Sequence, residues 1–218
     1  MSLELSGTTG VKGVAGSVSA PSIVGDDTNT GISFPAADTI KFSTGGVERM
    51  AITNSGISGI TSGITLADQW RMTSGFNGGA DPITNNWERN DTGWSELGTG
   101  ISAPSSGIFS FPSTGYYYIR FYASFGWTSS TPYIGLQINY TSNNSSYSRV
   151  GFAYAYLNNV TDTTYVSQSC EVMLKITDTS NQKISVSILR YVGNETFSVI
   201  SDTNDQRTGI TFLRMGDI

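Results

Sequence analysis

Apolar and polar residues alternate along much of the chain from residue 64 onward. In three places every second residue is apolar or aromatic, which is the period of a β-strand. These sets are Ile134, Leu136, Ile138 and Tyr140; Val150, Phe152, Tyr154 and Tyr156; and Cys170, Val172, Leu174 and Ile176. No long stretch follows the helical period without interruption by Gly, Pro or β-branched residues. The pattern therefore predicts an all-β domain.

Clusters of turn-forming residues separate the predicted strands of this domain, for example Pro112-Ser-Thr-Gly115. Their spacing of about 8–12 residues is typical of a β-sandwich or barrel. We expect strands at residues 69–74, 107–111, 116–127, 133–140, 149–157, 164–176, 183–192 and 209–215.

The first 63 residues are different, with 11 of the 25 glycines and only two aromatic residues. Two short apolar pairs, Ile40 with Phe42 and Met50 with Ile52, flank Gly45-Gly46, which predicts a hairpin turn. Strands this short bury little apolar surface within one chain. We therefore expect several copies to associate into a shared shaft, although a flexible Gly/Ser tether is the alternative. The predicted domains are residues 1–63, for attachment and shaft, and residues 64–218, for a head.

Composition excludes several classes of function. The net charge of −5 offers no basic surface for nucleic acid. Absence of His excludes His-based catalytic triads and His-bearing zinc sites. The single cysteine, Cys170, allows no internal disulfide and is predicted to be a buried small hydrophobe. We find neither an apolar run of about 20 residues nor an N-terminal signal, so we expect synthesis in a cytoplasm and no membrane insertion.

Two pairs of carboxylates deserve consideration as catalytic or metal-binding groups. Glu88 with Asp91, and Asp202 with Asp205, could serve glycan hydrolysis, but polar loops favour their interpretation as solvated turn residues. Asp202 and Asp205 are also weak candidates for a Ca²⁺ site, because their spacing matches no complete calcium loop. We therefore expect no catalytic residue, no bound metal and no cofactor.

Two segments of the second domain carry a family resemblance. They are Ser106-Gly-Ile-Phe-Ser-Phe-Pro-Ser-Thr-Gly-Tyr-Tyr-Tyr-Ile119 and Gly209-Ile-Thr-Phe-Leu-Arg-Met-Gly-Asp217. Together they resemble the second, third and last strands of the jelly-roll head in the complement-globular-head and tumour-necrosis-factor superfamily. The resemblance covers residues 68–217 and implies a jelly-roll sandwich of about ten strands that assembles as a homotrimer.

The N-terminal domain resembles a different group. Gly25-Asp-Asp-Thr-Asn-Thr-Gly-Ile-Ser-Phe-Pro-Ala-Ala-Asp-Thr-Ile-Lys-Phe-Ser-Thr-Gly-Gly-Val-Glu-Arg-Met-Ala-Ile52 is similar to segments of tail-fibre and other virion proteins. Those proteins belong to tailed bacteriophages, especially of marine and cyanobacterial hosts. The resemblance implies a location on the virion and docking of the N-terminal segment to other virion proteins.

Two sets of binding residues follow from the predicted topology. Successive loops of an antiparallel sandwich alternate between its ends, so one set of loops lies distal to the shaft. We predict receptor contacts there from Trp127, Tyr133, Asn158, Asn159, Glu195, Phe197, Asp205 and Arg207. Alternatively, Trp127 and Phe197 end core strands. A second aromatic face on several strands predicts trimer contacts from Tyr118, Tyr122, Tyr154 and Tyr156.

These observations predict a virion structural protein rather than an enzyme. We expect a homotrimeric phage fibre whose jelly-roll head adsorbs to a glycan or protein on the host surface. A capsid- or tail-mounted decoration or adaptor protein with a purely structural role is the first alternative. A glycan depolymerase is a further alternative, which is disfavoured because both carboxylate pairs fall in polar loops. A cellular trimeric signalling head is the last alternative, and the missing signal peptide and the phage-like N-terminal segment disfavour it.

Overall fold

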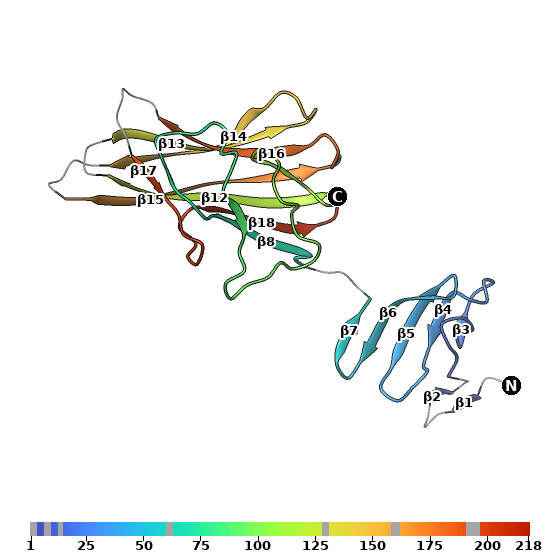
Figure 1. Cartoon of the computed structure of the whole chain (residues 1–218). Coiled ribbons are helices and arrows are strands. Elements are labelled where there is room, and N and C mark those ends of the chain that lie inside the picture. Colours follow the sequence, from blue (N-terminus) through green and yellow to red (C-terminus); the bar gives the residue numbers. More distant parts are fainter. Residues whose placement is uncertain are drawn as a thin grey trace. The chain divides into compact units, whose positions relative to one another are not determined.

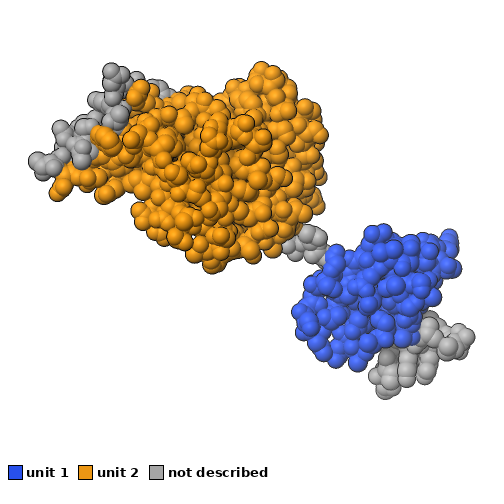
Figure 2. Space-filling model, in the orientation of Figure 1, with its two compact units in different colours: residues 1–62 blue, residues 63–218 orange. Residues whose placement is uncertain are grey.

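The computed structural model describes residues 4–6, 10–12, 15–59, 63–127, 131–157, 162–190 and 197–218. The chain divides into two compact units, Met1–Ser62 and Gly63–Ile218 (Figure 2). The regular structure of the described residues is entirely β (Figure 1). Among the described residues no helix is long and apolar enough to cross a membrane.

The N-terminal unit contains a hairpin and one antiparallel sheet. The hairpin pairs β1 (Glu4–Ser6) with β2 (Gly10–Lys12). The sheet is a meander of β3 (Ile23–Val24), β4 (Gly31–Ser33), β5 (Ile40–Thr44), β6 (Val47–Thr53) and β7 (Gly56–Ser58). Gly45 and Gly46 join β5 to β6 with φ angles of 60° and 73°, which side chains other than glycine rarely adopt. The predicted hairpin turn is confirmed.

One face of this meander is apolar. Directly opposite residues of antiparallel strands share a face, and two rows of such partners cross the sheet. The rows are Ile23, Ile32, Phe42 and Met50, and Ile40, Ile52 and Ile57. Ile23 and Ile57 at the edges are 55% and 64% exposed. The five strands come from one chain, and the trimeric shaft stays a prediction.

The C-terminal unit, or head, contains two antiparallel sheets among its described residues. The first is ordered β10 (Trp87–Arg89), β8 (Leu66–Met72), β18 (Gly209–Gly216), β12 (Gly115–Trp127) and β15 (Thr164–Ile176). In the same sheet β17 (Ser198–Ile200) pairs with the end of β12, and β9 (Phe76–Asn77) pairs with β17. The second is ordered β11 (Ile108–Ser110), β16 (Lys183–Arg190), β13 (Thr131–Thr141) and β14 (Ser148–Leu157).

The strand pairing is that of a jelly roll. The outermost pair in the sequence is β8 with β18, followed inward by β11 with β16, β12 with β15 and β13 with β14. Nested pairs of this kind describe one long hairpin rolled into a double sheet. The predicted all-β jelly-roll class of the head is therefore confirmed.

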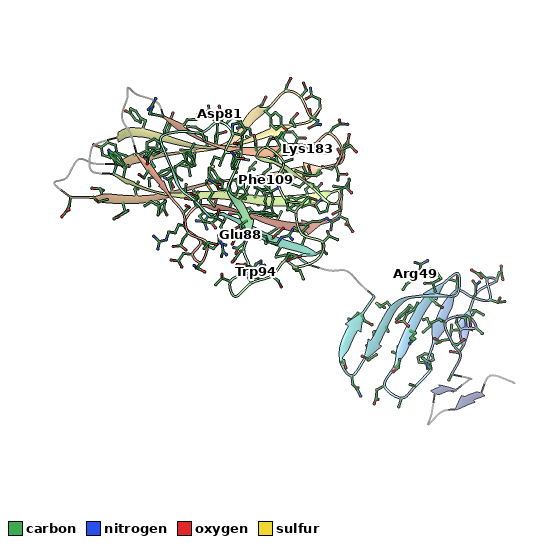
Figure 3. The ribbon with its side chains drawn as sticks, in the orientation of Figure 1. Arg49, Asp81, Glu88, Trp94, Phe109 and Lys183 are labelled. Atoms are coloured by element: carbon green, nitrogen blue, oxygen red, sulfur yellow. The ribbon has the colours of Figure 1, made fainter. Side chains whose placement is uncertain are left out.

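The core lies between the two sheets. Phe109 of β11 packs there against Phe212 of β18 (Figure 3). Ile134, Leu136 and Ile138 of β13 are completely buried, as their alternation predicted. In β14 the small residues Gly151 and Ala155 face the core, and Tyr154 and Tyr156 on the opposite face are exposed.

The predicted strands agree with the observed ones to within a few residues at each end. The largest difference is at the start of the head, where β8 begins at Leu66 instead of residue 69. The short strands β9, β10 and β17 were not predicted. Two or three residues with polar neighbours show too little alternation to be distinguished from a loop.

Cys170 of β15 is 4% exposed and faces the core, as predicted. Burial raises the pKa of its thiol to about 12, so the reactive thiolate is scarce near neutral pH. We expect the native protein to react negligibly with Ellman's reagent at pH 8, and to release one equivalent of thionitrobenzoate per chain once it is unfolded in guanidinium chloride. A full equivalent released rapidly without denaturant would contradict this burial.

Candidate functional site

The outer face of the first sheet carries rows of cross-strand partners, and the row through Tyr118 is apolar. Met173 of β15 pairs with Tyr118 of β12, which also pairs with Leu213 of β18. Leu213 pairs with Ala67, and Ala67 bridges to Leu97. Met173 is 70% exposed and Leu97 48% exposed. We call these five residues the apolar band.

A polar groove of about 440 Å³ lies beside the apolar band. Its lining includes Arg120, Tyr122, Ser124, Ser169, Gln206 and Thr211. Arg120 Nη2 donates a hydrogen bond of 3.3 Å to Ser169 Oγ. Tyr122 donates to Gln206 Oε1, and burial raises the pKa of this phenol to about 12. Tyr122 therefore remains a neutral donor across the physiological pH range.

An aromatic groove of about 460 Å³ follows at the distal end of the same face. Tyr165 of β15 lies directly opposite Gly126 of β12. A Cβ atom on Gly126 would lie 2.9 Å from two carbons of the Tyr165 ring, so the glycine allows the ring to lie against the strand. Tyr165 is nevertheless 70% exposed. The lining also includes the apolar side chains of Trp127 and Ile200 and the charged side chain of Arg207.

The strand ends around the predicted distal loops lie together. At this distal end Trp127 pairs with Thr164 in the first sheet, and Leu157 pairs with Thr131 in the second. The head begins at the other end of the first sheet, where Leu66 pairs with Arg214 (Figure 1). Trp127 and Arg207 line the aromatic groove. Tyr133 is 54% exposed and lies on the second sheet.

One predicted receptor contact requires correction. Phe197 is completely buried and packs edge to face on Phe125, with ring centroids 5.6 Å apart. It belongs to the core, as the alternative interpretation held, because its ring fills space between the sheets. Asn158, Asn159 and Glu195 lie outside the described residues, so their predicted role stays a prediction.

Arg207 holds the two carboxylates that were considered for calcium. Its Nη2 atom lies 3.2 Å from Asp205 Oδ2 and 3.7 Å from Asp202 Oδ2. The backbone N–H of Asn204 and the nearby Arg207 charge lower the pKa of Asp202. The described residues contain no group of three or more metal-ligating side chains. At Asp202 and Asp205 the guanidinium already supplies the positive charge that a cation would bring.

The four predicted trimer-contact tyrosines lie on two separate surfaces. Tyr118 belongs to the apolar band, where its hydroxyl donates to Glu171 Oε2 over 3.1 Å, and Tyr122 lines the neighbouring polar groove. Tyr154 and Tyr156 are 57% and 55% exposed on the outer side of β14. Tyr154 contacts Tyr133 and Phe152, with ring centroids 6.0 and 4.7 Å apart. We call Tyr133, Phe152, Tyr154 and Tyr156 the aromatic edge.

Glu88 and Asp91 were predicted to be solvated turn residues, which holds for Asp91, whose side chain is 75% exposed, but not for Glu88, whose side chain is 30% exposed. Both carboxylates bind the Nη2 atom of Arg71, at 2.6 and 2.5 Å, and Glu88 lies on β10 (Figure 3). Arg71 is 1% exposed and also donates to Asn90. Because one guanidinium holds both carboxylates, the pair lacks the separate acid and base environments of a glycosidase.

A second buried carboxylate, Asp68, organises the neighbouring loop. It accepts hydrogen bonds from the backbone N–H of Ile101 at 2.6 Å and from Trp70 Nε1 at 3.2 Å. Arg89 contributes an ion pair at 3.2 Å. These contacts attach the loop that follows β10 to β8, so the burial of Asp68 and its pairing with Arg89 have a structural role.

Comparisons with known proteins give matches in structure only. No protein family and no curated protein matches the sequence. The chain is similar to the structure of Eiger TNF from S. frugiperda, at 13% identity over 72% of this chain and 95% of that one, with a TM-score of 0.48. It is also similar to murine APRIL, at 13% identity over 71% of this chain and 100% of that one, with a TM-score of 0.47. The jelly-roll assignment rests on the strand order described above.

Proposed function

We propose that the protein is a homotrimeric attachment fibre of a virion, whose jelly-roll head binds a receptor on the host surface. The head recognises its receptor without catalysis, and the N-terminal unit connects it to the particle. Three heads on one axis give each fibre three equivalent sites, so that weak individual contacts add up to a firm attachment.

The observation that carries the proposal is the pair of exposed apolar surfaces on one head. The apolar band and the aromatic edge lie on different sheets, and both expose side chains that water solvates poorly. When the apolar band of one copy contacts the aromatic edge of the next, the copies associate head to tail. Such contacts form a closed ring when the rotation between neighbouring copies permits it. Three copies is the number that the superfamily resemblance implies.

The N-terminal unit supports association independently. Its apolar face, with Ile23 and Ile57 more than half exposed, belongs to a single sheet, which is marginal unless that face is covered. Neighbouring copies of the same unit would cover it. The assignment to a bacteriophage virion rests on the resemblance of residues 25–52 to virion proteins of tailed bacteriophages.

The proposal is tested by the mass of the full-length protein, measured by native mass spectrometry. We expect three copies of the 23.3 kDa chain. Met173→Glu should convert the trimer to monomers or weaken its assembly at least tenfold, because it places a charge in an apolar contact. Met173 is 70% exposed in the single chain, so the substitution should leave the fold of the head intact, as circular dichroism would verify.

Ser145→Glu is the matched control, since it adds the same charge to an exposed position in the loop between β13 and β14. It should remain trimeric. A wild-type monomer, or a Met173→Glu variant that assembles as well as the control, would argue against the proposed assembly. Particles that lack the protein but adsorb normally would favour the decoration role instead.

A further inference from the structure

We propose that the polar groove and the aromatic groove form one continuous site for an acidic oligosaccharide, a chain of sugars that carries carboxylates. The inference rests on the proposed function, because it names the receptor class of the head. It places recognition on the outer face of the first sheet rather than at the loop tips.

The aromatic groove supplies a stacking surface. Gly126 leaves the space in which the Tyr165 ring lies against β12, and one ring face remains available at 70% exposure. Ile200 also approaches this position, with its Cδ1 atom 3.1 Å from a Cβ built on Gly126. A rigid, exposed aromatic face with polar neighbours suits the C–H face of a pyranose ring.

The polar groove supplies hydrogen bonds and a positive charge. Its neutral lining includes the hydroxyl groups of Ser124, Ser169 and Thr211, and its described lining residues include no carboxylate. In the described part of the chain Arg120 makes no ion pair within 4.0 Å, and its hydrogen bond goes to Ser169. Glu171 faces Arg120 across the strands, but the Tyr118 hydroxyl binds one of its oxygens. Arg120 can therefore pair with a carboxylate brought by a ligand.

Arg207 joins the two grooves, because it belongs to the lining of both. Arg120 and Gly126 are six residues apart on β12, which corresponds to about 20 Å along the strand. A single sugar cannot span that distance, so the site fits an oligosaccharide. The net charge of −5 opposes long-range attraction of an anionic ligand, and selectivity must come from the local guanidinium of Arg120.

The test uses full-length protein and a hexamer of galacturonic acid, titrated by isothermal calorimetry, with maltohexaose as the neutral probe of equal length. We expect the acidic hexamer to bind at least tenfold more tightly than maltohexaose. Arg120→Gln should remove that preference and weaken binding of the acidic hexamer about tenfold. Tyr165→Ala should weaken binding of the same hexamer about fivefold.

Tyr165→Phe is the matched control, because it keeps the ring and should bind within about twofold of wild type. Gly126→Ala should reproduce the loss seen with Tyr165→Ala by displacing the ring from β12. Equal affinity for both hexamers, no binding of either, or wild-type binding by Arg120→Gln and Tyr165→Ala would overturn the inference.

Native masses of the same samples separate the two proposals. A trimer that does not bind the acidic hexamer contradicts the sugar site alone. A monomer that binds the hexamer with the expected mutational pattern contradicts the proposed assembly and supports the site.

Discussion

Asp68→Ala is expected to lower the free energy of unfolding of the full-length protein by about 3–5 kcal/mol. Asp68 is completely buried and accepts hydrogen bonds from the Ile101 backbone, the Trp70 indole and Arg89. Alanine leaves these donors without their acceptor, and the Arg89 charge loses its nearest buried partner. Urea unfolding at one fixed protein concentration measures the change, because association contributes to apparent stability.

Glu96→Ala provides a control at the same arginine. Glu96 Oε1 lies 3.4 Å from Arg89 Nη1, and its side chain is 34% exposed. Solvent screens this pair, so its loss should cost no more than about 1 kcal/mol. Equal losses for Asp68→Ala and Glu96→Ala would contradict the structural importance given to the buried carboxylate.

Local patterns in the sequence were sufficient to predict the longer strands of the head and the class of its fold. The glycine pair between two apolar pairs predicted the β5–β6 hairpin, because a turn with positive φ is a local requirement. The alternation of Ile134, Leu136 and Ile138 predicted a buried face, because strand geometry sends every second side chain to the same side.

Contacts between distant residues were beyond the reach of such patterns. Glu88 and Asp91 resemble solvated loop residues until Arg71, which precedes them by 17 and 20 positions, is brought against them by the β8–β10 pairing. Phe197 follows a polar stretch, and only the position of β17 beside β12 shows that its ring enters the core.

The candidate site was predicted in part for the same reason. Trp127 and Arg207 were selected from the distal loops, and both line the aromatic groove. Tyr165 and Arg120 were missed as binding residues, because their importance depends on cross-strand register. The Tyr165 ring can serve as a stacking surface for a sugar because Gly126 lies opposite it on β12. Arg120 can pair with a ligand carboxylate because the Tyr118 hydroxyl binds Glu171, the residue opposite Arg120.

Phe109→Ala should lower the free energy of unfolding by about 3–5 kcal/mol. Phe109 is 1% exposed, and its ring centroid lies 5.2 Å from that of Trp87 and 5.5 Å from that of Phe212. It belongs to β11 of the second sheet, whereas Trp87 and Phe212 belong to the first. Loss of the ring removes contacts between the two sheets and leaves a cavity that rigid aromatic neighbours cannot fill.

Trp94→Ala is the comparison that separates burial from aromatic character. Trp94 is a larger ring but is 41% exposed, so its removal should change the free energy of unfolding by no more than about 0.5 kcal/mol. Both variants are measured by urea unfolding under identical conditions. If Phe109→Ala were as stable as Trp94→Ala, the aromatic contacts that join the two sheets at β11 would not stabilise the head.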